Sequence, residues 1–294
     1  MQITQLDQVE DYSASLHRTG KSVRQDLLES ESGLEGYSLI ISRSEARFSP
    51  RHRHNFEQYR YQLSGTAEYS ATGTLKPGML GYFPEGMHYG PQLPAEEGMD
   101  CAVLVLQCGG ASGCGYVNRG EVLAGAKELQ TMGEFKDGVF YRNEGLPGKK
   151  NVEGSQAIWE HIMKRDLEYP KPRYAAPILT HPDSFDWIAV KGETGVFKKQ
   201  VGSFTERQTG AGFLKLEPKA QYTVTGNRDI FFVVSGTGSV ETVDGSNPYS
   251  HATSIFLDRG EALSITATEA TEILNFRLPD LTGLSGLMGI QAHA

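Results

Sequence analysis

The sequence predicts an all-β chain that contains two similar barrels joined by a short helical segment. The composition is the first observation behind this prediction: 294 residues with 34 Gly, 13 Pro, 38% hydrophobic and 22% charged residues suit a globular protein with many tight turns. The second is the rhythm of short β-like segments, which turn signals interrupt at roughly every 8–12 residues. The third is that the strand pattern of residues 35–114 returns in residues 181–280.

The repeat defines the expected domains. L-S-G-T-A-E at 63–68 matches V-S-G-T-G-S at 234–239, an offset of 171, and L-G-Y-F-P-E-G at 80–86 matches S-I-F-L-D-R-G at 254–260, an offset of 174. Self-similarity at half the chain length indicates a duplicated domain. We therefore expect an N-terminal extension (1–34), an N-terminal barrel (35–114), a helical connector (115–180), a C-terminal barrel (181–280) and a tail (281–294).

The connector carries two stretches with helical spacing. R-G-E-V-L-A-G-A-K-E-L-Q-T-M-G starts at Arg119 and ends at Gly133, where a glycine can terminate a helix. V-E-G-S-Q-A-I-W-E-H-I-M-K-R-D-L follows at 152–167, and Pro170 and Pro172 forbid its continuation. We expect one helix in each stretch.

The charge and the cysteine content exclude several classes. A net charge of −8 gives no general affinity for nucleic acid or for an anionic membrane. No apolar run approaches the length of a membrane span, and the first residues lack the basic and apolar regions of a signal peptide. Three cysteines do not make a disulfide framework. We expect a cytoplasmic protein.

The stretch P-R-H-R-H-N-F-E-Q-Y-R-Y-Q-L-S-G at 50–65 contains the candidate site. On a strand, His52 and His54 share one face, because side chains alternate with period two. Two adjacent imidazoles are half of a metal site, or two hydrogen-bonding groups of a metal-free pocket. Gln58 lies an even number of residues from the histidines, so on the same strand its side chain would point to the same face. Glu57 has the opposite parity and would need a bulge to turn inward; otherwise it is a surface residue.

This stretch resembles the first of the two motifs of the cupin superfamily. His52, His54 and Gly65 fit that motif, and Gln58 stands where a glutamate is usual. Gln58 keeps the register, but a neutral amide is a weaker ligand than a carboxylate.

A second segment resembles the other cupin motif. Gly78, Pro84 and Gly86 fit its framework, but the residue at its histidine position is Tyr89, and His88 stands one place earlier. Either His88 or Tyr89 could then face the pocket. The resemblance covers both β halves of the chain.

The resemblance implies two jelly-roll barrels, each a double-stranded β-helix, in one chain. It also implies one divalent transition metal held by His52, His54 and His88, with Gln58 or Glu57 assisting. Fe(II) is the first expectation, and Mn, Ni or Zn are alternatives. A homodimer is expected by analogy with the family.

The first motif is also similar to that of the gentisate and salicylate ring-cleaving dioxygenases. Those bicupins have an all-histidine iron site, and an arginine eight residues after the first histidine binds the substrate carboxylate. Here that residue is Arg60, which by parity faces the same way as Gln58 and implies a small anionic substrate. Their second motif is rich in tryptophan, whereas this chain has P-E-G-M-H-Y. The candidate catalytic residues are Arg60, Tyr89 and Glu57.

The second half of the chain lacks these candidate site residues. Thr223, Thr225 and Asp229 stand at the positions of His52, His54 and Gln58. The remaining equivalents, of Tyr89 and Arg60, are apolar: Leu263 and Phe231. We expect a metal-free, structural C-terminal barrel.

Three functions stay open on this sequence. The first is an iron-dependent dioxygenase that acts in the N-terminal barrel on a small carboxylated compound, aromatic or not. The second is a metal-dependent isomerase, cyclase or lyase at the same site. The third is a metal-free protein that binds a small molecule, which the Gln58 and Tyr89 substitutions favour.

Overall fold

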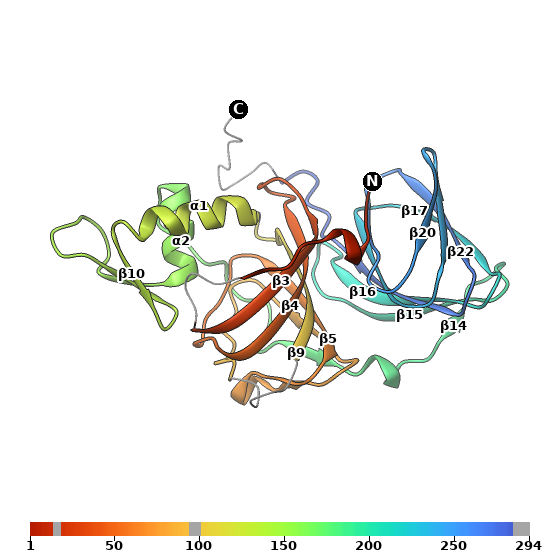
Figure 1. Ribbon diagram of the computed structural model, residues 1–294, viewed down its shortest axis with the longest axis horizontal. Helices are drawn as coiled ribbons and strands as arrows, with labels where there is room; N and C mark the ends of the chain where they lie inside the picture. The colour runs from red at the N-terminus through yellow and green to blue at the C-terminus, as the bar shows by residue number, and fades with distance from the viewer. Residues whose placement is uncertain (14–18, 94–100, 285–294) are drawn as a thin grey trace. The chain divides into compact units, whose positions relative to one another are not determined.

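The structure is a computed structural model that describes residues 1–13, 19–93 and 101–284 (Figure 1). The described chain divides into two compact units. The N-terminal unit holds residues 11–180 together with residues 283–284, and the C-terminal unit holds residues 1–10 and 181–282. Two α-helices accompany many strands in the described ranges, as the sequence predicts. Part of the expected tail, residues 285–294, lies outside the described residues.

The N-terminal unit is built on a seven-stranded antiparallel sheet with the order β13-β8-β5-β9-β4-β3-β2, and a hairpin of β6 and β7 accompanies it. Its strands are β2 (Tyr12–Ser13), β3 (Thr19–Glu29), β4 (Tyr37–Phe48), β5 (Glu57–Ser64), β6 (Ala67–Glu68), β7 (Thr74–Leu75), β8 (Leu80–Phe83), β9 (Cys101–Cys108) and β13 (Ile178–Thr180). The central strands β5, β4 and β9 are buried along most of their length, which explains their dense Leu, Ile, Val and Tyr content.

The segment predicted as an N-terminal extension is instead part of both units. Strand β1 (Gln2–Thr4) pairs with a strand of the C-terminal unit, while β2 and β3 form the edge of the N-terminal sheet. The polar sequence of β3 hid this strand. An edge strand needs only one apolar face, so its hydrophobic signal is weak.

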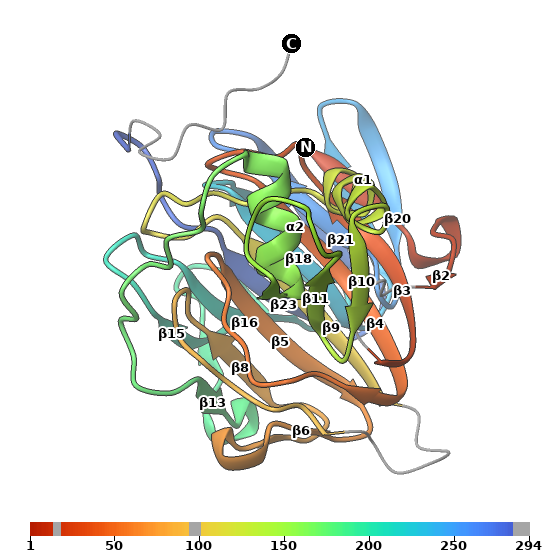
Figure 2. The same cartoon turned by 90° about the vertical axis from the view of Figure 1, so that its left-hand side faces the viewer.

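The connector contains both expected helices, α1 (Arg119–Leu129) and α2 (Gly154–Met163), each shorter than predicted (Figure 2). Asn118 caps α1, where its side chain accepts a hydrogen bond from the backbone N–H of Glu121 at 3.0 Å. A small antiparallel sheet that the sequence did not reveal lies between the helices in the chain. It consists of β10 (Gly133–Lys136), β11 (Val139–Arg142) and β12 (Asn151–Glu153). Leu129, Phe140 and Ile158 share one core that joins these elements.

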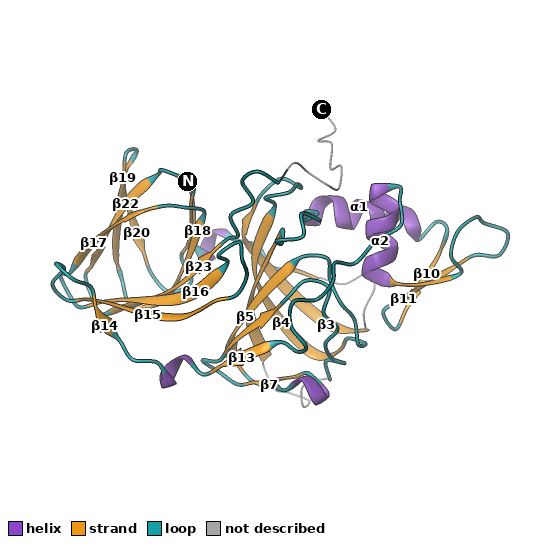
Figure 3. Ribbon diagram, turned by 180° about the vertical axis from the view of Figure 1, so that it is seen from behind, coloured by secondary structure: helices purple, strands orange, loops and turns teal. Residues whose placement is uncertain are grey.

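The C-terminal unit consists of a seven-stranded sheet, β1-β21-β18-β23-β16-β15-β14, and a four-stranded sheet, β17-β22-β19-β20 (Figure 3). The strands not yet placed are β14 (Ile188–Ala189), β15 (Val196–Ser203), β16 (Gly210–Leu216), β17 (Gln221–Thr225), β18 (Asp229–Ser235), β19 (Gly238–Thr242), β20 (Gly245–Tyr249), β21 (Ser254–Leu257), β22 (Ala262–Ala267) and β23 (Thr271–Arg277). Short 3-10 helices span Leu6–Gln8, Ser70–Thr72 and Pro182–Ser184. In the described part of the chain, neither helix has the length and apolar character needed to span a bilayer.

Candidate functional site

The pocket of the N-terminal unit lies on one face of its large sheet. In the strand register Arg60 stands opposite Val105, Val105 opposite Ile40, and Ile40 opposite Asp26. Because residues alternate between the two faces of a sheet, the next positions on this face are two residues away along each strand. Gln58 and Ser42 are such positions. All six of these side chains line the pocket.

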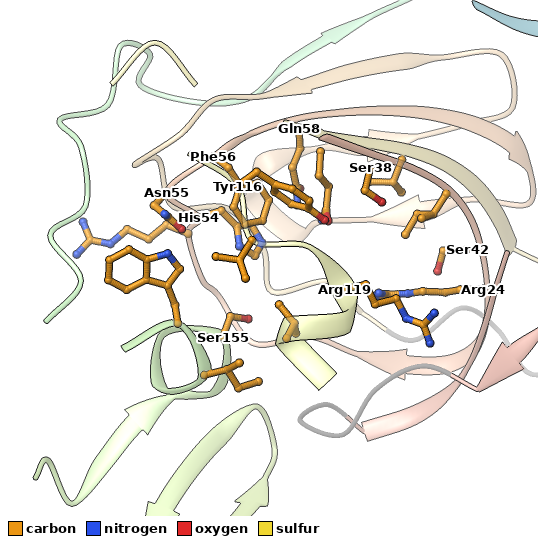
Figure 4. Close-up of a pocket in the computed structure, with 18 of the residues that line it drawn as sticks. Arg24, Ser38, Ser42, His54, Asn55, Phe56, Gln58, Tyr116, Arg119 and Ser155 are labelled. Carbon is orange, nitrogen blue, oxygen red and sulfur yellow. The ribbon is translucent and has the colours of Figure 1, made fainter. Parts of the chain in front are cut away.

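The connector supplies the opposite wall. Val122 of α1, Ile158 and Trp159 of α2, and Tyr169 beyond α2 line the same pocket. In the view of Figure 4, Arg24 and Arg119 lie together on one side of the pocket, and Asn55 lies on the other side. The cavity therefore has an apolar, partly aromatic wall and a sheet wall that carries most of its polar groups.

The charge of this pocket is opposite to that of the chain. Of the residues that the structure describes, four arginines line it, and a single acidic residue, Asp26, accompanies them. The protein as a whole has a net charge of −8. The positive potential of such a cavity attracts anions, although the protein as a whole is acidic. The pocket therefore suits a negatively charged ligand. The arginines are Arg24, Arg53, Arg60 and Arg119.

Arg60 occupies the depth of the pocket and is only 8% exposed. Its Nη1 donates to the Tyr69 hydroxyl at 2.6 Å, and its Nη2 donates to Tyr89 Oη at 2.8 Å and to Gln58 Oε1 at 2.9 Å. Burial lowers the pKa of Arg60, but the two tyrosines outweigh that effect and the net shift is upward, so the guanidinium stays charged. No carboxylate pairs with it among the described residues, and its Nε has no hydrogen-bond partner there.

The two histidines precede β5 rather than lying within it. His52 forms an isolated bridge with Tyr89, and its Nδ1 donates to the Pro50 carbonyl oxygen at 2.6 Å. The His52 and His54 rings lie 4.9 Å apart, at 80° to one another. His54 stacks on Phe56 at 4.6 Å and lines the pocket, whereas His52 is buried behind it and is absent from the lining.

The structure corrects the expected role of His88. The backbone of Tyr89 exchanges two hydrogen bonds with that of His52, which sets the register of this bridge. Tyr89 then points inward, 2% exposed, and its neighbour His88 points to solvent. Partial burial and the nearby cations Arg53 and Arg51 lower the pKa of His88. The third histidine therefore does not join the other two. Tyr89 is buried in its place, where its hydroxyl accepts a hydrogen bond from Arg60, but it does not belong to the pocket lining.

Glu57 also differs from both sequence expectations, because it is neither a ligand nor a surface residue. It is 0% exposed and lies on the sheet face opposite to the pocket. Its Oε2 accepts a hydrogen bond from the Tyr82 hydroxyl at 2.7 Å and one from the backbone N–H of Glu85 at 3.3 Å. Burial, followed by the charge of Glu85, raises the pKa of Glu57 to about 8.

Glu85 ties the connector to the barrel at this place. Ser112 donates its backbone N–H to Glu85 Oε1 at 2.8 Å, and Arg173 of the connector donates Nη1 to the same oxygen at 2.8 Å. Gly86, with φ of +76°, permits the close approach of this segment, since a Cβ there would overlap the Pro170 carbonyl oxygen. The connector thus covers the outer face of β5 and buries Glu57, which strand parity alone could not reveal.

The side chains do not form the metal centre that the cupin resemblance implies. His88 lies outside, Glu57 faces the wrong side, and Gln58 Oε1 already accepts from Arg60 and from Tyr89, the latter at 3.1 Å. No group of three His, Cys, Asp or Glu residues in the described ranges is placed to hold a metal ion. A buried guanidinium beside Gln58 would also repel a cation. The residues present therefore do not fit a three-ligand metal site.

Sequence reasoning did not find Arg24 and Arg119. Arg119 Nη1 pairs with Asp26 Oδ2 at 2.6 Å, and Tyr12 donates its hydroxyl to Asp26 Oδ1 at 2.6 Å. Arg24 and Asp26 occupy alternate positions of β3, and this period-two spacing in K-S-V-R-Q-D-L-L was the available signal.

The interior of the C-terminal unit is apolar. Phe231 and Leu263 belong to its core, and Thr223 and Thr225 are exposed on β17. Asp229 is buried and pairs with Arg277, Nε to Oδ1, at 3.4 Å. Phe231 and Leu263 therefore contribute to packing, and the positions equivalent to Arg60 and Tyr89 carry no polar group.

Several solved structures share this architecture. A candidate dioxygenase from Nostoc punctiforme PCC 73102 superposes with a TM-score of 0.61 at 11% identity, over 99% of this chain and 87% of that one. Oxalate decarboxylase of Bacillus subtilis, which has Mn(II) centres, gives 0.54 at 15% identity over 95% and 77% of the two chains. A protein from Geobacillus kaustophilus gives 0.52 at 16% identity over 94% and 93%.

These similarities establish the bicupin fold, with two jelly-roll barrels and a helical connector. At such low sequence identities, the similarities are evidence for the fold but not for the reaction. No protein-family model matches the chain, and no curated protein matches its sequence.

Proposed function

We propose that the N-terminal barrel binds a small organic anion, whose carboxylate contacts Arg60. The observation that carries this proposal is a buried guanidinium in a cationic pocket, with no acidic partner among the described residues. Removing such a charge from water is costly unless an anion neutralises it. The hydroxyls of Tyr69 and Tyr89 hold Arg60 in one orientation, which lowers the ordering cost when a ligand binds.

His54 and Gln58 supply the remaining polar contacts near Arg60. Both line the pocket, and a histidine and an amide can each donate a hydrogen bond to a ligand oxygen. Phe56 and Tyr116 offer aromatic surface beside them, with ring centroids 5.2 Å apart in an edge-to-face arrangement. This combination supports a ligand with a carboxylate and an apolar or aromatic body.

The proposal predicts that carboxylates, but not their neutral amides, stabilise the protein. We expect benzoate, salicylate and hexanoate to raise Tm in a thermal unfolding assay, since a ligand that binds only the folded state stabilises it by mass action. Benzamide, salicylamide and hexanamide are the matched controls and should leave Tm unchanged. Equal shifts for acids and amides, or no shift with any acid, would show that the pocket does not select anions.

A second candidate is the metal-dependent enzyme that the sequence predicts, an iron dioxygenase or a lyase, isomerase or cyclase. The observation that favours it is the buried pair His52 and His54, in a fold shared with a manganese enzyme. It needs a third ligand, which the described side chains do not supply.

Metal analysis separates the two candidates. We expect protein prepared without chelator and incubated with Fe(II), Mn(II), Ni(II) or Zn(II) to retain less than about a tenth of an equivalent after gel filtration. Retention of about one equivalent that is lost in a His52→Ala, His54→Ala double variant would instead support the metal-dependent candidate.

A further inference from the structure

We propose that Arg24 is a second anion-binding point of the same pocket, and that the ligand is an organic dicarboxylate with an apolar middle. This inference rests on the proposed function. It adds the size and the charge of the ligand, which Arg60 alone leaves open.

Arg24 is a cation without a counter-ion in the described part of the chain. No ion pair or hydrogen bond joins its guanidinium to another described residue, and its Nε is buried without a partner. It lines the pocket together with Arg60. A buried N–H that has lost water and gained no acceptor costs free energy, and an anion in the pocket would remove that cost.

Asp26 does not fill this role, although it is two residues away on β3. Its Oδ2 accepts from Arg119 at 2.6 Å, and its Oδ1 accepts from Tyr12 at 2.6 Å. Among the described residues, the only acidic side chain of the pocket lining is therefore already engaged, and it neutralises Arg119. Arg24, Arg53 and Arg60 remain as the described lining cations without a carboxylate from the pocket. Arg53 lies over the Tyr169 ring at 3.9 Å, whereas the buried Nε of Arg24 has no described partner.

The sheet register sets the distance between the two cations. Arg24 stands opposite Ser42 on β4, which stands opposite Val103 on β9, which stands opposite Gln62 on β5. Arg60 lies two positions from Gln62 on that strand, so Arg24 and Arg60 are three strands apart. Three strand spacings amount to on the order of 14 Å along a flat sheet, and the curvature of the barrel and the length of two arginine side chains shorten the gap.

The surface between the two arginines is apolar. Ile40, Val103 and Val105 form a small cluster on the pocket face of β4 and β9. The strand register places this cluster between the two arginines, an arrangement that suits one carboxylate at each of them. A chain or ring with a carboxylate at each end meets this arrangement, and its hydrocarbon middle would cover the three aliphatic side chains.

The test compares acids of equal carbon number by titration calorimetry on the full chain. The dicarboxylates are succinate, adipate and suberate, and the matched monocarboxylates are butyrate, hexanoate and octanoate. We expect at least one dicarboxylate to bind about tenfold or more tightly than its monocarboxylate partner, since a second charge-assisted contact is worth about that factor. Equal binding of the two series would overturn the inference.

Variants assign the second contact. Arg24→Met should weaken the preferred dicarboxylate about tenfold and the monocarboxylate much less, and Arg24→Lys should fall between Arg24→Met and wild type. Arg51→Met removes an exposed arginine outside the pocket and should change neither. Unchanged dicarboxylate affinity in Arg24→Met, with affinity for both series lost in Arg60→Met, would refute the second point and leave the proposed function standing. Failure of both series to bind the wild-type protein would refute both.

Discussion

Replacing Arg60 by methionine should reduce the affinity for carboxylates by about tenfold to a hundredfold, the largest effect on binding that we expect from one substitution. The reason is that a buried, charge-assisted pair contributes about 1.5–3 kcal/mol, and each 1.4 kcal/mol is a factor of ten. Methionine keeps a long unbranched side chain and removes the charge. The measurement is the Kd of a binding carboxylate, by calorimetry at fixed ionic strength.

Two further variants separate binding from stability. Arg60→Met also leaves the hydroxyls of Tyr69 and Tyr89 without their donor, so its Tm must be measured alongside the Kd. Arg60→Lys keeps the charge but loses the planar fork, and should recover only part of the affinity. Arg51→Met is the control for loss of a positive charge outside the pocket. Carboxylate affinity within about twofold of wild type in a folded Arg60→Met protein would disprove the role of Arg60.

Glu57→Gln should stabilise the protein at alkaline pH and have little effect at pH 5. The pKa of Glu57 is about 8 in the folded chain, because burial and the charge of Glu85 disfavour its ionised form. In the unfolded chain a glutamate has a pKa of about 4.3. Between these values the folded state holds the proton more tightly, so the stability present below about pH 4.3 is lost as the pH rises through about 8.

Glutamine stays neutral, and the variant avoids this loss. Each pKa unit corresponds to 1.36 kcal/mol, so the full shift sets a ceiling of several kcal/mol, and relaxation around a buried carboxyl lowers the expected gain to about 2 kcal/mol near pH 9. The Tyr82 hydroxyl, which donates to Glu57, can donate equally to an amide oxygen. Arg173 donates a hydrogen bond to Glu85, the acidic neighbour of Glu57.

The measurement is the Tm of both proteins from pH 5 to pH 9. The difference should grow with pH. Glu134→Gln, which changes an exposed glutamate on β10, is the matched control and should give a constant difference. If the Glu57→Gln and wild-type curves run parallel over this range, then Glu57 does not carry a proton in the folded state at neutral pH.

The sequence was informative where one strand determines the outcome. Alternation along β5 is enough to send Gln58 and Arg60 to one side and Glu57 to the other. The internal repeat is enough to predict two barrels. Phe231, the apolar residue that stands at the position of Arg60 in the second half, lies in the hydrophobic core of the second barrel.

The sequence was less informative where distant segments meet. The choice between His88 and Tyr89 depends on a backbone bridge to His52, more than thirty positions earlier in the chain. Glu57 lies beside Glu85, which in turn pairs with Arg173 of the connector. Arg24 lies in a segment whose polar sequence predicts an extension, whereas in the structure this segment pairs with β4. Each of these outcomes depends on tertiary contacts, which residue spacing does not encode.

The two walls of the pocket come from parts of the chain that have different structural roles. The sheet wall, with Arg24 and Arg60, belongs to strands that pair on both sides and carry the barrel, whereas Trp159 and Tyr169 come from the connector. A substitution at Trp159 can therefore change which ligand shapes the pocket accepts, while the arginines that bind the ends of the ligand stay in place. In this arrangement the barrel sets which charge enters the pocket, and the segment between the two barrels is free to diversify which molecule carries that charge.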